Sequence, residues 1–266
     1  MARQLDDRLF EALKGEMVPK FLATQDENGI PNVVPIISIQ PYSREVLIFG
    51  NFLMWKTEKN LRKNPLVSVT VITEDLFGAT IRGRFTGFQK VGEYADIVGS
   101  SNQLRYNAYT GIRNAGAIEI VDVSEPFRFK KTEVLVGLLQ ARALKPWAAR
   151  YSRGERIMHP VVQGLFARTV AVKVLSFVDH EGYPYALPVL SLQPAAADVL
   201  VFSRRHLCSR LIPLRDGAAV ASAVITLDPI AFQVKGRYKG ANGIWGAVIL
   251  DEAYHASPPF VGKKIA

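Results

Sequence analysis

The sequence has little that would link it covalently or hold it in a membrane. Among its 266 residues there is one cysteine, Cys208, which excludes an internal disulfide and a cysteine metal cluster. No apolar run reaches the roughly 18–20 residues that a membrane helix needs. Residues 1–7 lack the apolar segment of a signal peptide. We therefore expect a cytoplasmic protein with a hydrophobic core and no membrane partner.

Common catalytic signatures are absent as well. The four histidines, His159, His180, His206 and His255, share no metal-ligand spacing, so we predict no metal. No Walker loop, dinucleotide glycine fingerprint or serine-centred elbow appears. No side chain is recognisable as a catalytic acid or base, and the catalytic residues stay unassigned.

Acidic residues are scarce relative to basic ones, 24 against 33, which gives a net charge of +9. The excess gathers in residues 127–157. Such a run is usually a solvated connector. A groove for an anionic ligand and a weak nucleic-acid surface are the alternatives. The basic residues of this region are Arg128, Lys130, Lys131, Arg142, Lys145, Arg150, Arg153 and Arg156.

What the sequence does contain is a long internal repeat. Residues 21–87 align with residues 174–240 at a constant offset of 153 (174 − 21), without a gap. About 20 of roughly 67 positions are identical, in a repeat far longer than a solenoid unit. This pattern indicates a domain duplicated within one chain. Matching positions include Gly29, Pro31, Pro35 and Ser38 opposite Gly182, Pro184, Pro188 and Ser191.

Each copy has short β-branched runs separated by turns, which favours an antiparallel barrel. Gly83 in one such run indicates a bulge or a close backbone approach. The second copy lacks a counterpart of the helix at 93–99, so it is trimmed on one side. The expected strands are 21–24, 33–40, 45–50, 66–73, 79–88 and 117–123, then 170–177, 186–193, 198–202, 218–226, 230–239 and 247–250. The expected helices are 7–17, 56–63, 93–99, 133–143 and 160–168.

The most informative local motif is Trp55-Lys56-Thr57-Glu58-Lys59-Asn60, between a strand and a helix. Thr57 is a good N-cap, and its hydroxyl can also face a ligand. The first amides of a helix lack partners and carry partial positive charge, and Lys56 adds a full charge. Together these features predict a phosphate site. The alternative is a capped surface helix with a solvated lysine.

The strand order, the Lys56-Thr57-x-x-Asn60 motif and Ile81-Arg82-Gly83 resemble the FMN-binding split-barrel family. That family includes relatives of pyridoxamine 5′-phosphate oxidase, and the small bacterial FMN-binding proteins are the most similar. The resemblance implies a mainly β chain of two tandem split β-barrels, antiparallel and Greek-key-like, forming an intramolecular pseudo-dimer. The barrels would span residues 1–126 and 158–266, joined by a basic, partly helical linker at 127–157.

The resemblance also implies FMN in the groove between the barrels. The residues that it places at the cofactor are Val33, Val34, Pro35, Ile36, Gly50, Asn51, Lys56, Thr57, Asn60 and Arg82. In the second copy, Ser209 and Arg210 stand opposite Lys56 and Thr57, while Pro213 replaces Asn60 and removes an amide. With Arg204 and Arg205 they form a candidate second anion site, or a solvated basic loop. We expect one intact FMN site per chain.

The expected function is that of an FMN-dependent oxidoreductase similar to flavin reductases. The flavin would pass electrons from a small-molecule donor to a small acceptor, since the cofactor carries the redox chemistry. The alternatives are a non-catalytic flavin carrier or sensor and a split barrel that binds haem or a deazaflavin coenzyme. With haem, His255 would be the candidate axial ligand. A basic nucleic-acid-binding protein is a further alternative, and a homodimer of the two-domain chain stays open.

The one-site expectation leads to an asymmetry between two double variants. Lys56→Ala with Thr57→Ala should abolish FMN retention, because it removes the charge and the hydroxyl of the phosphate site. Ser209→Ala with Arg210→Ala should spare it. The measurement is the amount of flavin released per purified chain, and equal losses from both variants would contradict a single site.

Overall fold

The computed structural model describes residues 4–52, 54–100, 113–205, 207, 214–226, 230–241, 244–257 and 260–265. The first copy contains helices α1 (Asp7–Lys14), α2 (Trp55–Lys63) and α3 (Glu93–Gly99). Its strands are β1 (Lys20–Gln25), β2 (Pro31–Pro35), β3 (Gln40–Pro41), β4 (Val46–Gly50), β5 (Leu66–Ile72), β6 (Phe77–Gln89) and β7 (Ala115–Val123).

The short strand β8 (Phe127–Arg128) pairs with β6 and leads into α5 (Lys131–Ala143) and α6 (Lys145–Ala148). Helix α7 (Pro160–Ala167) opens the second copy. Its strands are β9 (Val172–Val178), β10 (Pro184–Pro188), β11 (Gln193–Ala196), β12 (Val199–Ser203), β13 (Ala219–Ile225), β14 (Ala231–Ala241) and β15 (Trp245–His255).

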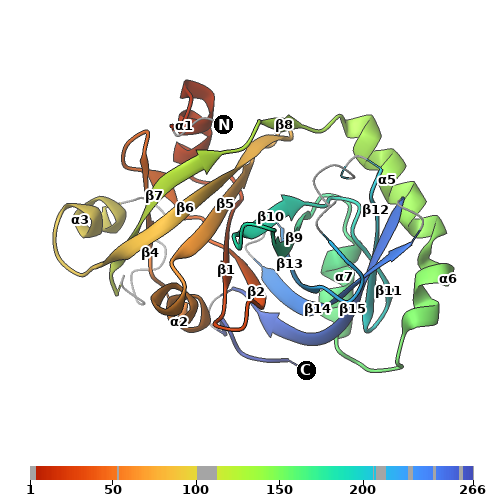
Figure 1. The fold of residues 1–266 in the computed structure, drawn as a ribbon. Helices are drawn as coiled ribbons and strands as arrows, with labels where there is room; N and C mark the ends of the chain where they lie inside the picture. The colour runs from red at the N-terminus through yellow and green to blue at the C-terminus, as the bar shows by residue number, and fades with distance from the viewer. Residues whose placement is uncertain are drawn as a thin grey trace.

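The two copies form two antiparallel sheets with the same strand order (Figure 1). The first runs β2-β1-β5-β6-β7-β4-β3 and the second β10-β9-β13-β14-β15-β12-β11. The pairing register repeats too: Phe21 lies opposite Thr70, and Val174 opposite Ala223, at the same offset of 153 (174 − 21 and 223 − 70). The mainly β fold of two tandem split barrels is therefore confirmed.

Three expected strands differ from the structure. The run at 186–193 is divided between β10, which ends at Pro188, and β11, which begins at Gln193. The run at 33–40 is not one strand, because the chain turns after Pro35, with the Ile39 amide donating to the Ile36 carbonyl, before β3 begins. The strand expected at 247–250 extends to Trp245–His255 because it pairs along nearly the whole of β14. Polar residues such as Asp251 and Glu252 interrupt the apolar pattern, so the sequence did not predict the full length of this strand.

Each copy packs its own apolar core, and a third cluster joins them. Phe21, Val33 and Ile72 of the first sheet meet Val174, Ala186 and Ile225 of the second, all buried. These two sets are related by the offset of 153, so the same face of each copy is used on both sides. That is the geometry of an isologous dimer interface, here within one chain.

The linker covers a face of the second sheet that a helix covers in the first. In the first copy, Val98 of α3 packs on Ile48 of β4. The second copy passes from β14 to β15 without such a helix, and Ala148 of α6 packs instead on Val201, the counterpart of Ile48. Figure 1 shows α5 and α6 along the outer side of the second sheet. The same face of each sheet is thus covered by unrelated segments.

Gly83 and its counterpart Gly236 lie where the strand register shifts, as expected for a bulge. A Cβ on Gly236 would lie 2.0 Å from the Ile249 carbonyl oxygen, which belongs to the backbone and cannot move aside. We predict that Gly236→Ala lowers the free energy of unfolding by about 1–3 kcal/mol, as overpacking does. Urea denaturation checks this value.

Gly164 in α7 is the matched control, because a Cβ there meets nothing within 4 Å. Gly164→Ala should be neutral or stabilising by up to about 1 kcal/mol, since alanine favours the helix. Equal destabilisation by the two substitutions would mean that the close approach at Gly236 is unimportant.

Candidate functional site

Helix α2 begins at Trp55, earlier than a cap at Thr57 would require. Met54 occupies the N-cap position and makes no side-chain capping bond, so the prediction that Thr57 caps the helix is wrong. Thr57 lies inside the first turn and is buried. Its hydroxyl accepts a hydrogen bond from the Asn32 side-chain amide at 3.3 Å. Thr57 therefore fixes the helix against β2.

A buried polar network continues from this contact into the second sheet. Asn60 of α2 donates to the Thr24 hydroxyl at 3.1 Å, and Asn32 donates to the same oxygen at 3.3 Å. Gln233 of β14 then donates to the Asn32 side-chain oxygen at 3.0 Å and to the Val33 carbonyl at 2.8 Å. The start of α2 is thus held at a fixed place in the interface between the two sheets.

Two lysines from different copies meet beside this network. Lys56 of α2 places its amine 4.1 Å from the centre of the Tyr254 ring on β15. Lys235 of β14 is buried, and burial together with the charge of Lys56 lowers its pKa to about 7. The carboxylates of Asp26 and Glu252 act on Lys235 in the opposite direction. Within the described ranges, neither amine has a carboxylate within 4.0 Å.

Tyr254 and Glu252 form the wall next to Lys56. The Tyr254 hydroxyl donates to Glu252 at 2.7 Å, and burial together with this bond raises the pKa of Tyr254. Burial alone would raise the pKa of Glu252. The Tyr254 hydrogen bond and the charges of Lys56 and Lys264 lower it by more, so the pKa is lowered. The site therefore has three lysines, Lys56, Lys235 and Lys264, against the carboxylates of Asp26 and Glu252, and Glu252 is already bound by Tyr254 and by Lys264 at 3.5 Å.

The backbone amides expected to contact the cofactor largely form hydrogen bonds within the protein. The Ile36 amide donates to the Lys20 carbonyl at 2.8 Å, the Gly50 amide to the Ser38 hydroxyl at 3.1 Å, and the Asn51 amide to the Asn114 carbonyl at 2.9 Å. Val34 and Pro35 are half-buried at the end of β2. The roles of these residues stay predictions.

The side-chain oxygens of Asn51 and Asn114 remain without a donor. Both are buried, and neither accepts a hydrogen bond from any residue that the structure describes. A buried acceptor without a partner costs free energy, so these two oxygens can accept bonds from a ligand hydroxyl or N–H group.

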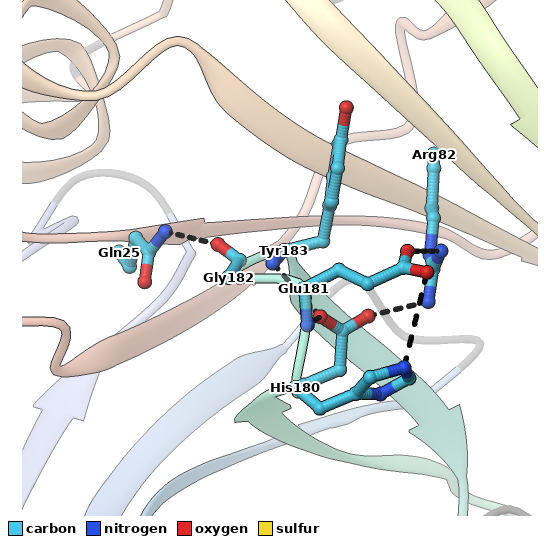
Figure 2. Close-up of polar contacts among 7 residues, drawn as sticks. Gln25, Arg82, His180, Glu181, Gly182 and Tyr183 are labelled. Atoms are coloured by element: carbon cyan, nitrogen blue, oxygen red, sulfur yellow. Dashed lines mark hydrogen bonds and ion pairs between the residues drawn. The ribbon is translucent and has the colours of Figure 1, made fainter.

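Arg82 does not join Lys56. It pairs with Asp179, at 2.5 Å, and with Glu181, both on the turn between β9 and β10 (Figure 2).

The candidate second anion site is only partly described. The Arg205 amide donates to the Ser203 hydroxyl at 3.3 Å, and Arg204 lies 5.7 Å from the Tyr238 ring centre. Ser209 and Arg210 lie outside the described residues, as do Cys208, His206 and Pro213.

Sequence reasoning missed Lys235, Gln233 and Tyr254, which the second copy contributes. A signal was present, because Lys235 stands opposite Arg82 at the offset of 153.

In the parts of the chain that the structure describes, no cluster of three or more histidine, cysteine or acidic side chains could hold a metal ion. No described helix has the length and apolar character needed to cross a bilayer.

The lowered pKa of Lys235 gives the stability a pH dependence. The folded pKa, about 7, lies below the ordinary 10.5, so the unfolded chain binds more protons in that window. The free energy of unfolding should therefore rise with pH between these values, by at most about 1.4 kcal/mol per pH unit from this group. Urea denaturation across the window measures the slope.

Lys235→Met should reduce that slope, whereas Lys59→Met on the exposed side of α2 should leave it unchanged. Lys20 and Lys173 also have lowered pKa values, about 8 and about 7, so their contributions to the slope should remain in both variants. An unaltered slope in Lys235→Met would show that this amine is not desolvated.

No protein-family model matches the sequence. An uncharacterized protein of Methanocaldococcus jannaschii is 34% identical over 97 residues. The match covers 35% of this chain and 62% of that protein, so the chain matches less than two thirds of this relative's length.

Among solved structures, the chain is similar to an FMN-binding protein from Syntrophomonas wolfei, with 19% identity and a TM-score of 0.39 over 47% of this chain and 90% of that one. It is also similar to an F420 reductase (20%, TM-score 0.32, 44% and 95%) and to the heme storage protein HutZ of Vibrio cholerae (16%, TM-score 0.34, 47% and 94%). The structures similar to this chain thus include an FMN-binding protein, an F420 reductase and a heme storage protein.

Proposed function

We propose that the chain binds FMN between its two barrels and uses it as an oxidoreductase cofactor. The observation that carries this proposal is the meeting of Lys56 and Lys235. Bringing two ammonium groups together, one of them buried, is unfavourable unless an anion joins them. A phosphate dianion would hold both amines charged and remove their repulsion.

The start of α2 adds to this pair. Its first amides carry the partial positive charge of a helix N-terminus, which favours a phosphate. Thr57 and Asn60 hold this turn against β1 and β2 through buried hydrogen bonds, so the amides cannot move away from the ligand. Fixed donors bind an anion without the cost of ordering them first.

The rest of the cofactor has acceptors ready for it. The unpartnered oxygens of Asn51 and Asn114 fit donor groups such as the hydroxyls of a ribityl chain or a ring N–H. When bound, FMN supplies the hydride or electron transfer itself. The chain would then bind and orient the flavin and limit the access of water, passing electrons between a small-molecule donor and acceptor.

The proposal predicts how FMN affinity responds to charge removal. Lys235→Met and Lys56→Ala should each weaken binding roughly 10- to 100-fold, because each removes one charge-assisted contact worth about 1.5–3 kcal/mol. Lys59→Ala, which removes the same charge from the same helix at an exposed position, should change affinity less than about threefold. Titration of FMN followed by flavin fluorescence gives the dissociation constants.

Three results separate the proposal from its alternatives. No FMN binding by the unaltered chain rules out FMN as cofactor, and the same titration with haem or a deazaflavin coenzyme then tests those ligands. Equal losses for all three variants would mean that phosphate is held by general surface charge. Tight FMN binding without reduction by any nicotinamide donor would favour a flavin carrier or sensor.

A further inference from the structure

The two barrels present one equivalent turn each to the partner copy. In the first turn, Asp26 accepts hydrogen bonds from the amides of Asn28 and Ile30, each at 2.9 Å. In the second, Asp179 accepts from the amides of Glu181 and Tyr183 at the same distances. Both turns therefore have the same backbone, with aspartate at the same place.

A cation from the opposite barrel faces each turn. Arg82 pairs with Asp179 of the second turn, and the charge of Asp26 in the first turn acts on Lys235. The two cations are counterparts of each other at the offset of 153 (235 − 82). The interface thus contains two related cation positions, one on each side of the pseudo-twofold axis.

The two positions differ in their counterions. Arg82 is bound by Asp179 and Glu181 together, and the Arg82 and Asp179 side chains are only 17% and 5% exposed. Figure 2 shows Glu181 reaching from the turn to Arg82, while Gln25 holds the same turn through the Gly182 carbonyl at 2.7 Å. On the other side, the counterpart of Glu181 is the neutral Asn28. Glu252 also acts on Lys235, but its carboxylate is bound by the Tyr254 hydroxyl and by Lys264.

We propose that the Asp179–Glu181 turn is an internal anion that occupies the second cation position, and that it confines an external phosphate to the Lys56–Lys235 side. The inference rests on the anion-binding part of the proposed function, but not on the identity of the cofactor. A guanidinium held by two carboxylates has its donor fork filled. Carboxylates fixed in the same chain also compete at a high effective concentration against a free ligand.

Inorganic phosphate is the probe, and its binding is measured by isothermal titration calorimetry in low salt. Asn28→Glu gives the first turn the carboxylate that the second turn has. It should weaken phosphate binding at least tenfold, whereas Asn28→Gln, of similar size and neutral, should bind like the unaltered chain. The position is exposed, so the substitution does not disturb a core.

The reverse change tests the other side. Asp179→Asn with Glu181→Asn removes both charges, while the amide side chain that replaces Asp179 keeps an oxygen to accept the turn amides. This double variant should bind a second phosphate per chain, abolished by adding Arg82→Met.

Phosphate binding by Asn28→Glu equal to that of Asn28→Gln would overturn the inference, as would a double variant that folds and still binds one phosphate. Phosphate binding that follows these expectations in a chain that does not bind FMN would leave the inference intact and refute only the proposed cofactor.

Discussion

The structure depends on how the edge strands β2 and β10 are covered. Each lies at the end of its sheet, so its outer carbonyls lack partners within that sheet. Gln233 donates to the Val33 carbonyl, and Thr80, the counterpart of Gln233, donates to the Ala186 carbonyl at 3.1 Å. Each barrel therefore satisfies a carbonyl on the edge strand of the other, within a shared apolar cluster. This exchange fixes β14 against α2, and so places Lys235 beside Lys56.

Burying a cation in this interface costs free energy, and the two sides of the interface offset that cost in different ways. The Arg82 side contains its own carboxylates, so it is neutralised before any ligand arrives. The Lys235 side is left with a lowered pKa and a second amine close by. A duplicated chain can differ in this way, because each position belongs to one copy only. In a homodimer, one substitution would alter both sides.

The sequence predicted the repeat, the strand order and the bulge at Gly83, because these depend on local patterns that survive in both copies. It also named Lys56, Thr57 and Asn60 as candidates, and their positions near a helix start are visible in the motif. Their roles toward a ligand stay predictions. It did not reveal Lys235, since half of the site comes from residues about 180 positions away in a strand that reads as ordinary alternation. The capping role given to Thr57 failed because the helix begins at Trp55 without a polar cap.

The linker has a consequence for where the second barrel begins. Since α6 covers Val199 and Val201 as α3 covers the first sheet, the second barrel is incomplete from α7 onward. Ser152 and the Arg153 amide also hold the buried Asp198 carboxylate, at 2.5 and 2.6 Å. We therefore expect the folding unit of the second copy to start near Lys131 and not at residue 158, and a chain cut between α6 and α7 to leave an apolar sheet face open to self-association.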